Sequence, residues 1–409
     1  MLFRSRIRGA GERANPRGGV YGVVLSDRMH VLHLNYAYEP VHDGEALLAR
    51  FPTLTQLCEA QTRAGLQVTV LQRFWRDDDI KLNGVCYQLR YDGARAALAA
   101  RPWTFLPHLH QIARRTQPDI VHVNGLVFPT QVLQLRHWLG KDTPIVVQHH
   151  GERPTSWKMR WLQRHCLFAA DGYLFTAEAI AAEWRTQGVI RAGQSVLEVI
   201  EGSCHFAPVQ KTLARRNAPL PGNPAILWVG RLHERKDPLS VLAGFALAQT
   251  SLPDAHLTMI YNAAPLLPQV QAQIDQSPGL RSRVHLMGAL SHHALPNWYS
   301  AADLFITGSP AEGSNYALIE SMACGTFAVC SDIPANRKVI DQGRYGELYT
   351  VGDAQACAAA IIRAVSRSQS VPTSDIRTHF ERNLSWSAIA QQSQQAYQQL
   401  ITAKREQHR

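Results

Sequence analysis

Apolar runs of four to six residues alternate with longer segments of helical periodicity along the first half of the chain. The runs predict strands and the segments between them predict helices. Strands are expected from about residue 30 and at 67–71, 118–123, 144–148, 171–176 and 195–200, with helices at 54–63 and 105–116. Strand–helix–strand units connect parallel strands, so residues 30–205 are predicted to form one Rossmann-like domain.

The second half repeats this alternation after a proline-rich segment, 206–224, which shows no periodicity and is predicted to connect two domains. Strands are then expected at 225–229, 256–261, 284–287, 304–306 and 326–330, and helices at 239–248 and 315–323. Residues 225–384 should therefore form a second Rossmann-like domain. The predicted fold class is α/β, with two Rossmann-like domains that face each other across a cleft.

The two ends of the chain have their own patterns. Residues 1–29 are basic and lack the apolar core of a secretory signal, so they are predicted to form a loose N-terminal arm. Residues 385–409 are rich in Gln and carry apolar residues at helical spacing, which predicts a C-terminal helix that packs against either domain.

The stretch 301–328 contains a strand, a loop and a helix, and it is the first candidate for a binding site. Glu312 lies in the loop, and Glu320 lies in the helix. Ligands of open parallel sheets bind outside the carboxyl ends of the strands, where this loop is expected. Free backbone donors at the helix start suit a phosphate, and they belong to Gly313, Ser314 and Asn315. Two glutamates eight positions apart also occur by chance in helical proteins.

The loop after the predicted strand 225–229 carries a second cluster. Gly230 lets the backbone approach a ligand, and Arg231 and Lys236 place two cations at the same edge of the sheet. At an effective dielectric of about 20, a cation ~4 Å from a phosphate contributes roughly 4 kcal/mol of gross attraction. Two such cations could stabilise a departing diphosphate without a metal. A solvated loop with an ordinary group of charges is the alternative.

Composition narrows the possible partners and the compartment. The formal net charge of +10 favours an anionic partner, yet no run of five Lys or Arg occurs, so a nucleic-acid function is not supported. Seven cysteines without a CxxC pair indicate neither a disulfide framework nor a zinc site, and a cytoplasmic protein is expected. No segment approaches the roughly 20 apolar residues that span a bilayer.

Several histidines stand in pairs, and the sequence predicts no metal site at any of them. His149 and His150 are adjacent on a predicted strand, so their side chains should point to opposite faces. The remaining pairs, His108 with His110 and His292 with His293, have no cysteine or acid at ligand spacing.

The motifs of the second domain together resemble those of retaining glycosyltransferases of family 4, which have the GT-B fold. The resemblance rests on Gly230-Arg231 with Lys236 five positions later, on Glu312 and Glu320, and on 323–325, Ala-Cys-Gly. The first domain is similar at 118–122 and at the strand that ends in His-Gly, 150–151. The resemblance extends from about residue 30 to about residue 399.

This resemblance implies a role for each residue of the second domain. Arg231 and Lys236 match the pair that holds the donor diphosphate, and Glu320 matches the acid that binds the ribose. Glu312 matches the acid beside the transferred sugar, and the amides of 313–315 would meet the distal phosphate.

His150 matches a first-domain histidine that faces the donor sugar. The resemblance further implies retention of the anomeric configuration, a front-face route without a protein nucleophile, and no need for a metal or other cofactor.

The chain departs from the family pattern at three places. Residues 36–40, Tyr-Ala-Tyr-Glu-Pro, stand where a glycine pair is common, and 262–264, Asn-Ala-Ala, where a glycine turn is common. Lys338 replaces a frequent glutamate. A catalytically silent sugar-nucleotide-binding protein, a sugar-nucleotide epimerase and a phosphorylase therefore stay open as alternatives.

The expected activity is that of a hexosyltransferase. The expected donor is a UDP- or GDP-sugar, and the expected acceptor is a glycan, a lipid-linked intermediate or a secondary metabolite. The positive charge suggests peripheral contact with an anionic membrane at its inner surface.

Overall fold

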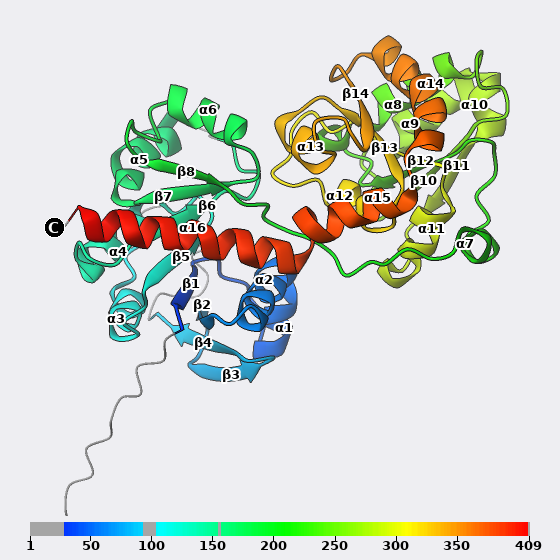
Figure 1. Cartoon of the computed structure of the whole chain (residues 1–409). Coiled ribbons are helices and arrows are strands. Elements are labelled where there is room, and N and C mark those ends of the chain that lie inside the picture. The colour runs from blue at the N-terminus through cyan, green and yellow to red at the C-terminus, as the bar shows by residue number, and fades with distance from the viewer. Residues whose placement is uncertain (1–27, 93–103, 154–156, 408–409) are drawn as a thin grey trace, which may run out of the picture.

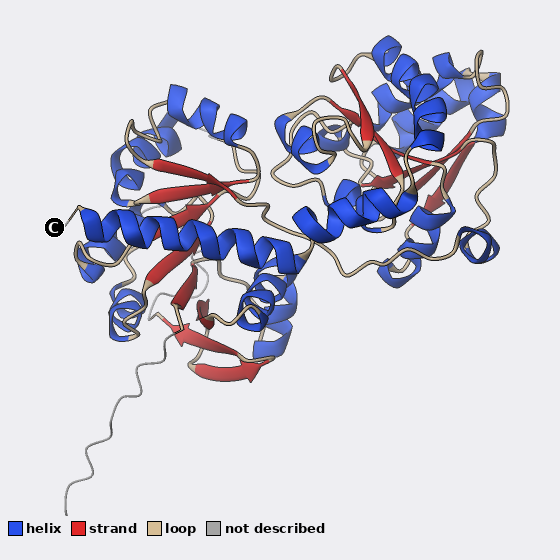
Figure 2. Ribbon diagram, viewed as in Figure 1, coloured by secondary structure: helices blue, strands red, loops and turns tan. Residues whose placement is uncertain are grey.

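The computed structural model describes residues 28–92, 104–153 and 157–407, and these residues form two α/β units, each built on one open sheet (Figures 1 and 2). Most of the predicted N-terminal arm lies outside the described residues. The first unit holds strands β1–β8, and the second holds β9–β14. The α/β architecture with two parallel-dominated sheets confirms the predicted fold class.

The first sheet has the strand order β3-β4-β2-β1-β5-β6-β7-β8, and its pairs are parallel except for β3 with β4. Its central strands are almost continuously buried because helices cover both faces. The β3–β4 hairpin was not predicted, although its Asn83-Gly84 turn, with φ of 50° and 82°, is a recognisable signal. The strands are β1 (His30–Asn35), β2 (Gln67–Phe74), β3 (Asp78–Leu82), β4 (Val85–Tyr91), β5 (Ile120–Asn124), β6 (Ile145–Gln148), β7 (Gly172–Phe175) and β8 (Ser195–Glu198).

Three helices of the first unit, α2, α3 and α4, begin with a proline, which suits the first helical turn because its backbone nitrogen needs no acceptor. The helical elements of this unit are α1 (Gly44–Arg50), α2 (Pro52–Arg63), α3 (Pro107–Arg115), α4 (Pro129–Leu139), α5 (Trp157–Cys166), η1 (Leu167–Ala169) and α6 (Glu178–Thr186).

The second sheet has the order β11-β10-β9-β12-β13-β14, and all its pairs are parallel. The direction of winding reverses between β9 and β12, and a crevice for ligands forms at such a point in open α/β sheets. The loops that carry the two candidate motifs follow these two neighbouring strands. The strands are β9 (Ala225–Gly230), β10 (His256–Tyr261), β11 (Val284–Gly288), β12 (Leu304–Thr307), β13 (Phe327–Ser331) and β14 (Gly346–Tyr349).

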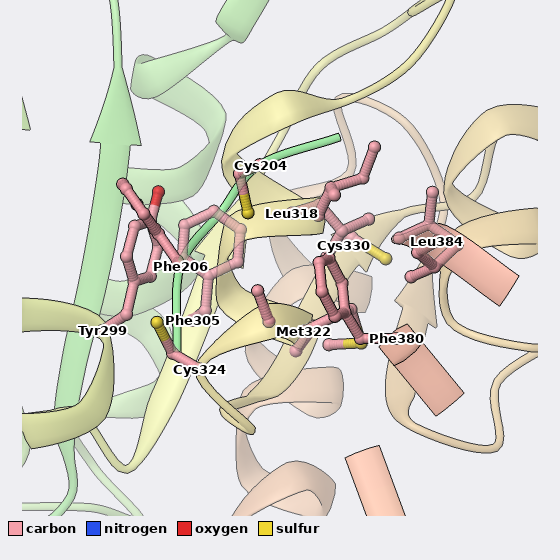
Figure 3. Close-up of a cluster of buried hydrophobic side chains, with 14 of the residues drawn as sticks. Cys204, Phe206, Tyr299, Phe305, Leu318, Met322, Cys324, Cys330, Phe380 and Leu384 are labelled. Carbon is pink, nitrogen blue, oxygen red and sulfur yellow. The ribbon is translucent and has the colours of Figure 1, made fainter. Parts of the chain in front are cut away.

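Helix α12 carries Glu320 and is fixed from behind by an apolar core. Its Leu318 and Met322 are fully buried, in the same cluster as Phe380 and Leu384 of η4 (Figure 3). The helical elements of the second unit are η2 (Glu234–Lys236), α8 (Pro238–Ala248), α9 (Leu267–Gln276), α10 (Pro278–Arg283), η3 (His292–Ala294), α11 (Leu295–Ala301), α12 (Tyr316–Ala323), α13 (Pro334–Val339), α14 (Ala354–Ser370), α15 (Thr373–His379) and the π-helical turn η4 (Phe380–Leu384).

The segment expected to connect the two domains contains a short helix, α7 (Lys211–Asn217), that packs against α11. Lys211 and Arg215 both form ion pairs with Asp303. These contacts fasten the helix to the second unit. Seven residues are too few to display a helical hydrophobic period, which explains why the sequence pattern did not reveal α7.

Helix α16 (Trp386–Glu406) returns from the second unit to the first and packs on α2 and β8 (Figure 1). The Tyr397 hydroxyl lies 2.6 Å from His122 Nδ1, and Gln61 Nε2 donates to Ser393 Oγ at 2.9 Å. Lys404 Nζ also pairs with Asp171. The chain therefore passes between the two units twice, once after β8 and once at the start of α16.

Candidate active site

A cavity of about 600 Å³ opens in the second unit where the loops after β9 and β12 meet. The five predicted residues Gly230, Arg231, Lys236, Glu312 and Glu320 all line it. The structure thus brings together two motifs that are about eighty residues apart in the sequence. Asn262, from one of the departures from the family pattern, also lies in its wall.

Lys236 and Glu312 form an ion pair through Nζ and Oε1, and both side chains are largely buried, with 25% and 14% exposed. The turn that presents Lys236 ends at Asp237, whose φ of 42° reverses the chain and whose side chain caps α8. Arg231 is exposed at the cavity, and its side chain forms no hydrogen bond or ion pair with any residue that the structure describes. One cation is therefore held by a carboxylate, while the other is available to a ligand.

The Glu320 carboxylate also lines the cavity, and its residue is 8% exposed. The Tyr299 hydroxyl donates to Oε2 at 2.8 Å, and His292 Nε2 lies 2.9 Å from Oε1. The hydrogen bond to this carboxylate raises the pKa of His292. Tyr299 is fully buried, and its hydroxyl orients Glu320.

The start of α12 presents unused backbone donors towards the interface of the two units. Among the described residues, no acceptor is recorded for the backbone N–H groups of Gly313, Ser314 and Asn315. The buried Asn315 side chain donates to Asn336 Oδ1 at 3.1 Å and thereby holds the loop against the second sheet. Four such free donors are normal at a helix start, and an anion can bind them.

His150 is the predicted site residue of the first unit, and it lines a separate cavity of about 350 Å³. Its Nδ1 lies 2.8 Å from Glu201 Oε2. Burial lowers the pKa of His150, but the hydrogen bond to Glu201 and the charges of Glu201 and Glu152 outweigh burial, so its pKa is raised. His149 stacks on Phe175 at 4.8 Å, whereas His150 contacts Glu201, so the two side chains have different neighbours. Both histidines follow β6, which ends at Gln148, and do not lie on the strand as predicted.

Sequence reasoning missed Glu201 and Glu152, which surround His150. Glu201 is 5% exposed and lies three residues after β8, at the same edge of the sheet as the end of β6. Its position after a strand was a usable signal. Its pairing with a histidine 51 residues earlier was not visible in the sequence.

The two units touch beside these cavities. The backbones of Gly151 and Gly313 approach so closely that a Cβ atom on Gly313 would lie 2.5 Å from the Gly151 nitrogen. Tyr316 of α12 reaches across the interface, and its hydroxyl lies 3.0 Å from Thr53 Oγ1. The cation-bearing cavity and the cavity at His150 therefore form two sides of one site.

Lys338, which replaces a glutamate that is frequent in the family, lies at the interface of the two units. Lys338 Nζ forms an ion pair with Glu198 at the end of β8, so a second-unit cation meets a first-unit acid. The departure near residue 36 has a different basis: Tyr36 is buried, and its hydroxyl lies 2.9 Å from His110 Nε2.

The described part of the chain contains neither a metal-binding cluster nor a helix that could span a membrane. Within residues 28–92, 104–153 and 157–407, no group of three or more His, Cys, Asp or Glu could hold a metal ion. Over the same ranges, no helix combines the length and the apolar character that crossing a bilayer requires.

Known proteins with similar sequences are glycosyltransferases. The mannosyltransferase of Mycolicibacterium smegmatis that acts on phosphatidyl-myo-inositol is 24% identical over 84% of this chain and 88% of its own length. The D-inositol 3-phosphate glycosyltransferases of Thermobispora bispora and Streptosporangium roseum are 26% and 28% identical, but only 48% and 39% of their lengths are covered. The chain thus spans about half or less of the length of these two relatives.

Solved structures share the arrangement of both units. Sucrose-phosphate synthase from Thermosynechococcus elongatus is 22% identical, with 92% of this chain and 100% of that chain covered and a TM-score of 0.67. Anabaena HepE, in complex with UDP and glucose, is 16% identical, with 91% and 100% covered and a TM-score of 0.64. At such identities the likeness shows the fold, which is GT-B.

Two family models match successive parts of the chain. The model described as "Glycosyltransferase Family 4" matches residues 52–198, and the one described as "Glycosyl transferases group 1" matches residues 223–367. Together they span more than half of the chain and fall on the first and second sheet in turn. Since both matches and the arrangement of the two units agree, this chain belongs to glycosyltransferase family 4 and has the GT-B fold.

Proposed function

We propose that this protein is a retaining glycosyltransferase that moves a hexose from a nucleotide diphosphate sugar to an acceptor bound by the first unit. The observation that carries the proposal is the distribution of charge in the cavity of about 600 Å³. Arg231, Lys236 and the Glu320 carboxylate all line it. A nucleotide diphosphate needs cations for its phosphates and an acceptor for its ribose hydroxyls.

The diphosphate would lie between Arg231, Lys236 and the free amides at the start of α12. The Arg231 side chain has no ion-pair partner among the described residues, so a phosphate would gain its charge without first breaking such a pair. Lys236 is held by Glu312, and a phosphate would share this ammonium group with the carboxylate. These positive groups neutralise the departing diphosphate, and we therefore propose a metal-independent reaction.

The ribose would bind at Glu320. Its carboxylate has spare lone pairs because Tyr299 and His292 each use only one oxygen. The base would then lie towards Leu290 and Asn262, which line the same cavity. Solved structures of the same fold carry UDP, UDP-glucose or ADP, which supports a nucleotide diphosphate donor, and we propose a UDP- or GDP-sugar.

In the proposed reaction, the bond between the anomeric carbon and the phosphate oxygen breaks with its electron pair on the leaving diphosphate. The acceptor oxygen forms the new bond on the same face, and its proton passes to a phosphate oxygen. Glu312 stabilises the positive charge that develops on the sugar ring. His150, held by Glu201, donates to a sugar hydroxyl from the opposite wall of the site.

The acceptor is proposed to be a glycan, a lipid-linked intermediate or a secondary metabolite. It would enter from the first unit, where the cavity at His150 is lined by Asn35, Asn124 and Glu201. Amide and carboxylate side chains of this kind suit an acceptor that carries several hydroxyl groups. The named relatives that act on inositol derivatives support an acceptor of that character.

The proposal is tested first with the purified protein in the presence of a chelator. Thermal shift and donor hydrolysis are measured with UDP-, GDP-, ADP- and dTDP-sugars. One nucleotide sugar should raise the melting temperature by a few degrees, because it binds only the native state. The anomeric configuration of any product is then read by NMR.

The outcomes separate the alternatives. Transfer with inversion would refute the retaining mechanism, and dependence on a divalent metal would refute metal independence. Binding without transfer to any acceptor, or conversion of the donor into an epimer, would replace the proposed activity with the silent or the epimerase alternative.

A further inference from the structure

Helix α5 of the first unit exposes an unusual stripe of aromatic side chains. Trp157 is 69% exposed and Trp161 is 55% exposed, and both lie on one face of the helix, since they are four positions apart. Phe168, in the following turn η1, continues the stripe and is 44% exposed. Large aromatic side chains gathered on a solvent-facing surface mark an interaction site more often than isolated ones do.

Cations flank this stripe. The stretch 157–168 contains Lys158, Arg160 and Arg164 and no Asp or Glu. Lys158 Nζ lies 5.6 Å from the Trp157 ring centroid, and Arg191 Cζ lies 4.5 Å from that of Phe168. The aromatic rings and the positive charges therefore belong to one surface.

The opposite face of α5 belongs to the protein interior. Gln163 and Cys166 are buried, and Gln163 Nε2 donates to the Leu126 carbonyl at 3.1 Å. Met159 and Gln163 also line a cavity of about 620 Å³ whose wall includes Gly151 and Glu152. A single helix thus separates an aromatic, cationic outer surface from a cavity next to His150.

We propose that the exposed face of α5 docks on an anionic lipid bilayer. Tryptophan rings are favoured at the boundary between headgroups and acyl chains, because the ring is apolar and its N–H is polar. Lys158, Arg160 and Arg164 supply the attraction to lipid phosphates. A helix with aromatic residues on the lipid side and neighbouring cations lies in the plane of the membrane and does not span it.

This surface also bears on the acceptor, a step that rests on the proposed function. A bilayer in contact with Trp157 and Trp161 lies on the outer side of the helix whose inner side lines the cavity beside Glu152. The headgroup of a lipid-borne acceptor could enter that cavity while its chains stay in the membrane.

The experiment measures co-sedimentation of the full-length protein with vesicles at low salt. Vesicles of equimolar phosphatidylcholine and phosphatidylglycerol are compared with phosphatidylcholine alone. The variants are W157A/W161A, which removes the rings, and K158S/R160S, which removes two cations. Their matched controls are F105A and R114S/R115S, which change exposed residues of the same unit and the same chemistry at another surface.

The wild-type protein should co-sediment with the anionic vesicles and should not co-sediment with the phosphatidylcholine vesicles. The double Trp variant should bind at least roughly tenfold more weakly, and the double cation variant on the order of 10-fold more weakly, with the loss restricted to low salt. Both controls should bind like the wild type. The proposal would be overturned if the wild-type protein did not bind anionic vesicles. It would also be overturned if the α5 variants bound these vesicles as strongly as the wild type.

Nucleotide-sugar binding is measured by thermal shift in the same preparations without vesicles. The α5 variants should keep the wild-type response, since none of the changed residues lines the cavity of the second unit. Loss of vesicle binding with this response intact supports the docking surface. A wild-type protein that binds vesicles but no nucleotide sugar would refute the proposed function alone.

Discussion

The two sides of the proposed active site differ in their charged groups. The second-unit side presents Arg231, Lys236 and backbone N–H groups that have no acceptor among the described residues. The first-unit side presents His150 between the carboxylates of Glu201 and Glu152. The proposed phosphate-binding groups of the second unit are cations and backbone donors, whereas the first-unit side acts through a histidine. The second unit also carries a histidine, His292, whose pKa is raised, but this ring lies against Glu320.

This difference suits the two sides to different parts of the donor, the diphosphate and the sugar. A donor diphosphate keeps its negative charge throughout binding and reaction, so fixed cations suit it. A neutral sugar hydroxyl needs an oriented donor, and a histidine provides one whose protonation its neighbours control. We therefore expect mutations of the second-unit cations to act at all pH values and mutations of His150 and its partners to act with a pH dependence.

The largest effect is expected for Lys236→Ala. The change removes a cation from the diphosphate and leaves the largely buried Glu312 carboxylate without its partner. We expect kcat/KM to fall on the order of 100-fold or more, since loss of one charge-stabilising donor typically costs that much. Steady-state kinetics at several pH values measure it, and K236R, which keeps the charge, serves as the control. A strongly pH-dependent loss would contradict the division between the two sides.

His150→Ala is expected to have a smaller effect, roughly tenfold to 100-fold on kcat. It removes one donor from the sugar but leaves the diphosphate site intact. Binding of the free nucleotide diphosphate, followed by calorimetry, should not change. His149→Ala is not a useful control because that buried ring stacks on Phe175. If H150A lost as much nucleotide affinity as K236A, the proposed distinction between the two sides of the site would be wrong.

Glu201→Gln should change the pH dependence of the first-unit side. Glu201 helps to raise the pKa of His150 above its ordinary value of 6.5. The stability that this pair contributes is complete below that value and is lost as the pH rises through the raised pKa. In the variant, the fall of activity and of unfolding free energy should both move to lower pH. Activity profiles and denaturant titrations over pH 5 to about 9 test this, and an unchanged profile would contradict it.

Gly313→Ala tests the contact between the two sides. The added methyl group would lie 2.5 Å from the Gly151 nitrogen, so one backbone must move. We expect about a tenfold loss of kcat/KM. Gly279→Ala is the matched control because its methyl group meets only the end of the Gln249 side chain. Full activity of G313A would mean that the closed contact is not needed for transfer.

The smallest effect is expected for His292→Ala. His292 occupies one oxygen of Glu320, and its side chain is 63% exposed. Exposed pairs of this kind contribute only ~0–1 kcal/mol, so the nucleotide should bind up to about fivefold more tightly once the oxygen is free. Calorimetry with the nucleotide diphosphate measures the change. Weaker binding would show that His292 assists the ribose.

The second-unit side could be predicted from the sequence because each motif is local. Gly230, Arg231 and Lys236 follow one strand, and Glu312 and Glu320 follow the strand that lies beside it in the sheet. The strand order β9-β12 brings the two loops together. The alternation of strands and helices does not encode this order, and the two motifs were assigned to one donor site through the family resemblance.

The first-unit side could be predicted only in part because its contacts are long-range. His150 was found through its place after a strand, but its partner Glu201 is 51 positions away. The contacts of Lys338 with Glu198 and of Tyr316 with Thr53 join residues 140 and 263 positions apart. No local period or turn signal encodes such distances, and the same holds for helix α7, which is too short to show a period.

The two passages of the chain between the units limit how the cleft can open. A body joined to another by one flexible strand of chain can rotate in any direction, whereas two separate connections leave mainly rotation about the line that joins them. Here one connection follows β8, and the other is the junction of η4 and α16. The cleft should therefore open mainly by a hinge rotation of one unit about the axis through the two connections, and a single rotation angle would describe the motion.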